Sequence, residues 1–156
     1  ALRRSLSDEA YNLIKGDTDS EHIFAMFADK IGNVEPLGLA EIKSGLLAAI
    51  EEIERLKTNA GVSEPSTMNL VLGDGKHLVA TRYVSRGEDS NSLYYISMGK
   101  YSCREGETRM AEGEQCFLVV SEPLNDDERW QKVENNHVVL VDAESKVTIE
   151  PIPTFA

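Results

Sequence analysis

The spacing of hydrophobic residues changes near Gly61, and this change restricts the chain to folds in which helices precede strands. Before Gly61 the apolar residues recur at steps of three and four, as on one face of an amphipathic helix. After Gly61 short apolar runs are separated by turn-forming residues, which is typical of strands joined by hairpins. The sequence therefore predicts an α+β domain with a helical layer over residues 1–60 and antiparallel strands over residues 61–156.

Three helices are expected in the first part of the chain. A short one follows Ser7 and ends before Gly16, and a second begins at Thr18 and is stopped by Gly32. A third and longer helix covers Leu39–Lys57, where charged side chains oppose one apolar stripe. The stripe consists of Ile42, Leu46, Ala49, Ile50, Ile53 and Leu56.

Six strands are expected in the second part: Met68–Leu72, His77–Val84, Leu93–Ser97, Cys116–Ser121, His137–Val141 and Lys146–Glu150. Asp74 and Gly75 give a hairpin signal between the first two strands. Polar loops that contain glycine are expected at 86–92 and 104–115. The run Phe117–Val120 is continuously apolar, which is typical of a strand covered on both faces and predicts that the helices form a layer over the sheet.

The composition excludes several classes of protein. A formal net charge of -11 argues against nucleic-acid binding, which depends on clustered Lys and Arg. No stretch approaches the roughly 18 apolar residues of a membrane span, and the start of the chain does not read as a signal peptide. Cys103 and Cys116 lie in no CxxC pair, which favours free thiols in the cytoplasm, with a disulfide between them as the open alternative.

The segment Gly16–His22 carries the most informative local pattern, and two interpretations of it are compatible. In the structural one, Thr18 caps a helix and Glu21 reaches back to the Thr18 amide, as in a capping box. In the functional one, the cap fixes Asp19 in the first turn, where its carboxylate can accept a charge-assisted hydrogen bond from a ligand ammonium group. On the pattern alone both interpretations stay open, with Asp19 as the candidate substrate ligand and Thr18 and Glu21 as further candidates.

Other polar and aromatic residues also have two interpretations. Arg82 and Glu122 either form an ion pair that braces the sheet or contact a substrate, and both are candidate site residues. The three histidines share no H-x-x-x-H or H-x-H spacing, so no metal site is expected. Tyr94, Tyr95 and Trp130 either belong to the core or stack on a ligand.

Several segments resemble the class-II glutamine amidotransferases. Thr18-Asp19-Ser20-Glu21 resembles the (S/T)-D-(S/T)-E element of that family, whose Asp receives the α-amino group of the glutamine substrate. Further segments occur in matching order: Ala1–Arg4, Leu6–Glu9, Asn69–Leu70, Asp74–Gly75, Leu78–Tyr83, Leu93–Tyr95 and Val119–Leu124, with Trp130 and His137. The resemblance covers most of the chain and is closest to the branch that includes the fungal glutathione-degrading amidotransferase subunit and the bacterial ergothioneine-pathway amidohydrolase.

The resemblance implies part of a four-layer αββα N-terminal-nucleophile hydrolase sandwich that acts on glutamine or another γ-glutamyl compound. In that family the thiol of an amino-terminal cysteine attacks the side-chain amide and forms a thioester, while asparagine and glycine stabilise the oxyanion. Residue 1 of this sequence is alanine, and no Asn-Gly pair occurs. We therefore expect residues 1–156 to be the C-terminal part of one glutamine amidotransferase domain, without a catalytic residue of its own and inactive alone.

The resemblance also implies the partners. We expect a γ-glutamyl small molecule, the amino-terminal region of the same domain and a partner enzyme subunit, with a role in glutathione metabolism and no cofactor. The alternative is a non-catalytic binding or scaffold module that keeps the same fold.

Overall fold

The computed structural model describes residues 2–87, 91–104 and 107–155. The chain divides into two compact units, one formed by Ala1–Pro65 with Pro153–Ala156 and the other by Ser66–Ile152. In the described part of the chain, no helix combines the length and the apolar character that crossing a membrane requires.

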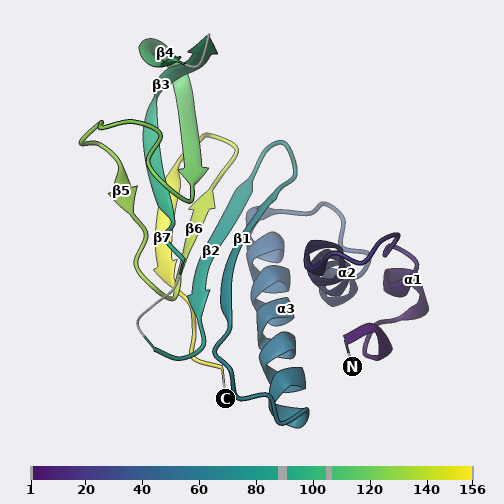
Figure 1. Cartoon of the computed structure of the whole chain (residues 1–156). Helices are drawn as coiled ribbons and strands as arrows, with labels where there is room; N and C mark the ends of the chain where they lie inside the picture. The colour runs from purple at the N-terminus through teal and green to yellow at the C-terminus, as the bar shows by residue number, and fades with distance from the viewer. Residues whose placement is uncertain (1, 88–90, 105–106, 156) are drawn as a thin grey trace. The chain divides into compact units, whose positions relative to one another are not determined.

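The first unit contains the helices: a 3-10 turn η1 at Leu2–Arg4, then α1 at Asp8–Tyr11, α2 at Asp19–Ile31 and α3 at Leu39–Asn59 (Figure 1). The predictions for α2 and α3 are confirmed, with α3 extending two residues beyond the predicted end. The first helix is shorter than predicted and makes a single turn after its Ser7 cap. Beyond Tyr11 the chain continues in tighter turns, in which the amides of Leu13 and Ile14 donate to the carbonyls of Ala10 and Tyr11.

Helices α2 and α3 pack against each other through their apolar faces. The stripe predicted on α3 is buried at Ile42, Leu46, Ala49 and Ile50. A glycine lies where the helices approach most closely, because a Cβ built on Gly45 would overlap Cγ2 of Ile31 and lie 3.0 Å from Cε2 of Phe27, both on α2. The absence of a side chain at Gly45 therefore sets the distance between α2 and α3.

The second unit contains two antiparallel sheets (Figure 1). The first sheet has the order β1-β2-β6-β7, with β1 at Thr67–Gly73, β2 at Leu78–Val84, β6 at His137–Val141 and β7 at Val147–Pro151. The predicted hairpin between β1 and β2 is confirmed, and its turn contains Gly75 at a φ of 89°. These four strands were all predicted within two residues of their bounds.

The second sheet has the order β4-β3-β5, with β3 at Tyr94–Arg104, β4 at Glu107–Val120 and β5 at Gln131–Lys132. The loop predicted at 104–115 is wrong, because β3 and β4 continue to pair as a long hairpin up to Arg104 and Glu107. Backbone hydrogen bonds can extend a hairpin through polar sequence, where no apolar alternation marks the strands. The two-residue β5 is too short to leave any periodic signal.

One apolar cluster joins the sheets of the second unit. It contains Ala80 and Val139 from the first sheet and Leu93 and Val133 beside the second. Phe117 and Val119 of β4 pack against this cluster but stay half-buried, as do their neighbours through Val120. The mixed architecture of helices followed by antiparallel strands thus agrees with the predicted α+β class.

We predict that Gly45→Ala destabilises the protein. A helical alanine is better than glycine by about 1 kcal/mol, but overpacking a helix interface costs typically about 1 to 3 kcal/mol, and the overlap with Ile31 involves a stiff branched side chain. Urea unfolding should therefore show a lower free energy of unfolding. The control is Ser44→Ala, at the exposed neighbouring position, which should be neutral or slightly stabilising. Equal stability gains in both variants would contradict the packing argument.

Candidate functional site

The start of α2 is capped as the sequence predicted. Thr18 has the extended backbone of a cap residue, and its Oγ1 accepts a hydrogen bond from the Glu21 amide at 3.3 Å. The same hydroxyl donates to Oε2 of Glu21 at 3.1 Å. Thr18 and Glu21 are therefore bonded to each other in both directions.

The carboxylate of Glu21 also organises the chain before the cap. Its Oε1 accepts hydrogen bonds from the amides of Lys15 at 3.3 Å and Gly16 at 3.1 Å, further back than a capping box alone reaches. A Cβ at Gly16 would lie 2.6 Å from Oε2 of Glu21, so a side chain at this position would displace the Glu21 carboxylate. The turn before α2 is thus wound around one carboxylate.

These contacts change the pKa of Glu21. Desolvation raises this pKa, but hydrogen bonds from the Thr18 hydroxyl and from the amides of Lys15, Thr18 and Gly16 outweigh it, and the net pKa is lowered. Because its hydrogen bonds are made within the turn, the Glu21 carboxylate holds residues 15–18 in place. The Thr18 hydroxyl is likewise engaged within this turn.

Asp19 differs from both neighbours in its availability. It is the first residue of α2, it is exposed, and its carboxylate makes no hydrogen bond or ion pair with any residue that the structure describes. A negative charge in the first turn is favoured by the helix dipole. The structure therefore presents Asp19 as an accessible carboxylate on a backbone fixed by its neighbours.

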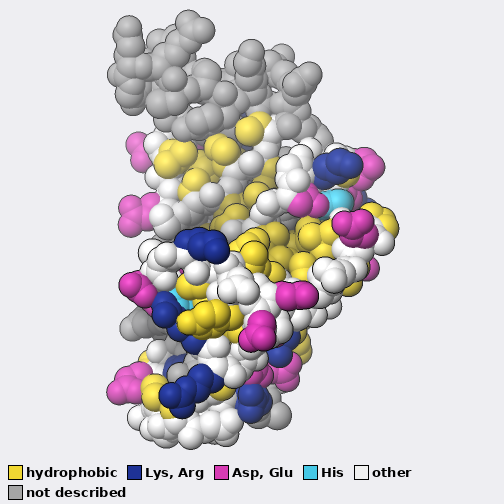
Figure 2. All heavy atoms as spheres, turned by 90° about the vertical axis from the view of Figure 1, so that its right-hand side faces the viewer, with side chains coloured by type: hydrophobic (Ala, Val, Ile, Leu, Met, Phe, Trp, Pro, Cys, Tyr) yellow, Lys and Arg dark blue, Asp and Glu magenta, His cyan; other side chains and the backbone are white. Residues whose placement is uncertain are grey.

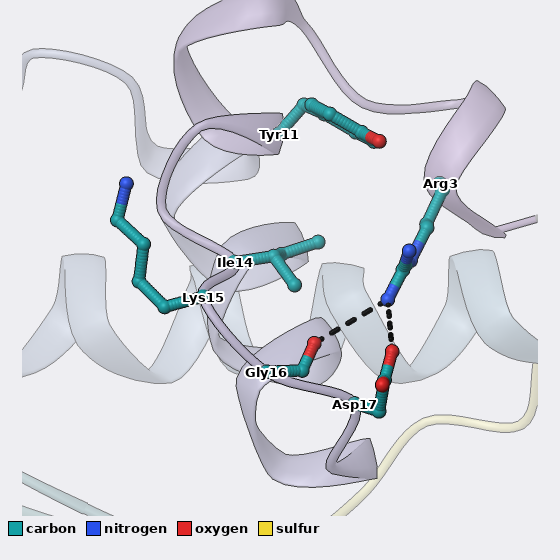
Figure 3. Close-up of a pocket in the computed structure, with 6 residues that line it drawn as sticks. All are labelled: Arg3, Tyr11, Ile14, Lys15, Gly16 and Asp17. Carbon is teal, nitrogen blue, oxygen red and sulfur yellow. Dashed lines mark hydrogen bonds and ion pairs between the residues drawn. The ribbon is translucent and has the colours of Figure 1, made fainter.

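A second set of contacts with the same turn comes from a residue on another element. Arg3, on η1, donates from Nη2 to Oδ1 of Asp17 at 2.8 Å and to the carbonyl of Gly16 at 3.3 Å (Figure 3). Its Nε donates to Nε2 of His22 at 2.8 Å. The sequence analysis did not select Arg3 as a site residue, since it lies 13 to 19 residues from these partners and no local pattern links them.

A hollow of about 220 Å³ lies beside this cluster. Figure 3 shows Arg3 reaching from its own turn toward Gly16 and Asp17, with Tyr11 and Ile14 nearby. Lys15 completes the lining. The hollow thus lies beside residues 14–17, which lead to the cap of α2.

Arg82 and Glu122 belong to the second unit. The guanidinium of Arg82 is buried on β2, where its Nε donates to the carbonyl of Asn91 at 3.0 Å and its Nη1 donates to the carbonyl of Val133. Glu122 is exposed and forms no ion pair with any described residue. Of the two interpretations, the ion pair between them is therefore wrong, because backbone carbonyls accept hydrogen bonds from the buried guanidinium. A substrate contact by either residue stays a prediction.

The other polar residues weighed from the sequence have structural contacts. His77 pairs with Asp74 at 2.9 Å in the β1–β2 turn, and this hydrogen bond, with the amides of His77 and Lys76, holds the pKa of Asp74 well below its usual range. Trp130 donates to Asn125 at 2.9 Å within its own loop. Among the described side chains, no group of three or more His, Cys, Asp or Glu is arranged to hold a metal ion.

The remaining expectations concern aromatic residues, cysteines and surface charge. Tyr95 stacks on Phe117 with ring centroids 5.7 Å apart, which is the core role of the two considered for it. Cys116 is a free, half-buried thiol, so the disulfide alternative is not adopted. On the face drawn in Figure 2, basic and acidic side chains are interspersed and no continuous basic surface is visible among the coloured residues.

Comparisons with known proteins agree on one family. The family described as "Glutamine amidotransferases class-II" matches residues 5–154. The probable glutamine amidotransferase DUG3 of Saccharomyces cerevisiae is 28% identical over 170 residues, which cover 97% of this chain and 47% of the yeast protein. This chain therefore spans about half the length of that relative.

Solved structures show the same relationship. A glutamine aminotransferase class-II domain protein from Silicibacter pomeroyi has a TM-score of 0.70 and 26% identity, covering 98% of this chain and 60% of that one. A predicted glutamine amidotransferase from Pseudomonas aeruginosa has a TM-score of 0.60 and 20% identity, covering 87% of this chain and 52% of that one. The second likeness shows the fold alone.

The lowered pKa of Glu21 predicts a specific dependence of stability on pH. Because the pKa is lower in the folded than in the unfolded chain, the contribution of Glu21 is complete above its unfolded pKa and is lost as the pH falls through its folded pKa. The difference in unfolding free energy between wild type and Glu21→Gln should therefore shrink on acidification. Urea unfolding over a pH series measures it, with Glu51→Gln on the exposed face of α3 as the control. A difference in unfolding free energy that does not change with pH would contradict the lowered pKa of Glu21.

Proposed function

This chain belongs to the class-II glutamine amidotransferase family, and from that premise we propose that Asp19 binds the α-amino group of glutamine or another γ-glutamyl compound. One observation carries the proposal: the Asp19 carboxylate is exposed and unbonded to described residues, on a turn held by Thr18 and Glu21. A charge-assisted hydrogen bond needs an acceptor whose position is fixed. Asp19 meets this requirement, and Thr18 and Glu21 act through it.

The reaction that fits this recognition is transfer or hydrolysis at the side-chain amide. A thiolate adds to the amide carbonyl, and the C–N bond of the tetrahedral intermediate then breaks. The proton released by the thiol is transferred to the departing nitrogen, so that ammonia or another amine leaves. The acyl group stays on sulfur as a thioester. Water or an amine then takes the acyl group and restores the thiol. In this scheme Asp19 orients the substrate and takes no part in bond making.

We propose that the thiol comes from a cysteine outside residues 1–156 and that these residues supply a substrate contact but no catalytic group. The family mechanism uses the free α-amine of a terminal cysteine, and an internal cysteine has no such group. Cys116 is also half-buried in β4, opposite Met98 of β3. A free Cys116 thiol supports a cytoplasmic location for the protein.

The role of Asp19 is tested in the full-length protein that carries this chain. Asp19→Asn keeps the size of the side chain and removes its charge, and we expect glutamine binding to weaken by about 1.5 to 3 kcal/mol. Calorimetric titration with glutamine measures the change. Asp8→Asn, which neutralises an exposed carboxylate in the first turn of α1, should leave the affinity unchanged. Equal affinities of wild type and Asp19→Asn would exclude Asp19 from the site.

The source of the nucleophile is tested with a glutamine analogue that carries an electrophile in place of the side-chain amide. We expect the full-length protein to be labelled once, on a cysteine outside residues 1–156, and Cys116→Ser to be labelled equally well. Peptide mass spectrometry locates the label. A label on Cys103 or Cys116 would contradict the proposed division of roles.

A further inference from the structure

The position of Asp19 depends on contacts made by its neighbours. Its own carboxylate makes no bond with described residues, so the side chain is placed by the backbone of the turn and of the first helical residues. Glu21 holds that backbone through the amides of Lys15 and Gly16. Any further group that bonds to this turn therefore also affects where the Asp19 carboxylate lies.

Arg3 is such a group. Its guanidinium contacts Gly16 and Asp17 immediately before the cap (Figure 3). It also contacts His22, one turn after the cap. The three acceptors thus lie on both sides of Asp19 in the sequence. A planar guanidinium presents its donors in a fixed fork, so the three bonds together define an orientation as well as a distance.

The histidine continues this connection to the cap residue. Because the Nε of Arg3 can only donate, Nε2 of His22 must be the acceptor in their 2.8 Å hydrogen bond. The ring hydrogen then lies on Nδ1, which is 2.7 Å from the carbonyl of Thr18 and donates to it. A chain of hydrogen bonds therefore runs from Arg3 through His22 to the residue that precedes Asp19.

We propose that Arg3 is a positioning residue for substrate recognition: it holds the turn on which Asp19 binds the substrate amino group. This inference rests on the proposed role of Asp19. A purely stabilising role does not explain the arrangement, because the Arg3 side chain is 44% exposed and Asp17 is 96% exposed, and exposed ion pairs contribute little to folding stability. What three bonds from one guanidinium supply at this surface is a defined geometry.

The test compares Arg3→Ala, Arg3→Lys and Arg4→Ala in the full-length protein, by ammonia release from glutamine. Arg4 is the matched control, since it is the neighbouring exposed arginine and makes no hydrogen bond or ion pair with described residues. We expect Arg3→Ala to raise KM for glutamine about tenfold, equivalent to about 1.4 kcal/mol, with a much smaller change in kcat and in Tm. Arg3→Lys should fall between wild type and Arg3→Ala, and Arg4→Ala should match wild type.

A spectroscopic measurement accompanies the kinetics. Ring nitrogen chemical shifts of His22 should report hydrogen on Nδ1 in wild type and in Arg4→Ala, and a mixture of tautomers in Arg3→Ala. An unchanged KM in Arg3→Ala, while Asp19→Asn still weakens glutamine binding, would overturn the role of Arg3 and leave that of Asp19. If Asp19→Asn has no effect, the proposed function of Asp19 fails first, and the positioning role falls with it.

Discussion

The hydrogen bonds of the Glu21 carboxylate are the interaction on which the candidate site depends. One side chain accepts from the amides of two residues before the cap and from the hydroxyl of the cap residue itself. These donors all precede the first residue of α2, so the Glu21 side chain reaches back from the helix to the turn that leads into it. These hydrogen bonds fix the backbone of residues 15–18. The Asp19 carboxylate thereby gains a defined position, although it makes no bond with described residues.

The sequence predicted the parts of this site that local rules govern. The Thr18 cap, the Glu21 contact and the end of α2 at Gly32 all depend on residues within a few positions of each other, and all three are confirmed. Arg3 was not identified, because its role comes from a contact across the first unit that has no spacing rule. The ion pair considered for Arg82 and Glu122 was wrong for the same reason, because the acceptors of Arg82 are backbone carbonyls, which any sequence could supply.

The fold shows the same division between local and distant information. Helices α2 and α3 and the core strands β2 and β6 have strong periodic or continuous apolar patterns, and they were predicted with small errors at their ends. The polar half of β4 was predicted as a loop because its pairing with β3 is carried by the backbone. Gly45 illustrates the limit of sequence information within a helix. Glycine is by itself a weak helix former, whereas the structure places Gly45 at the contact between α2 and α3.

The two carboxylates on either side of the cap explain why recognition is assigned to only one of them. Asp17 is almost fully exposed, yet its charge is paired with Arg3 at 2.8 Å, so an incoming ammonium group would have to compete with a guanidinium. Asp19 is exposed without such a competitor among the described residues. The pairing that makes Asp17 a poor ligand also fixes the backbone beside Asp19. One aspartate thus serves as an anchor for the turn, which leaves the carboxylate of the other available for the substrate contact that we propose.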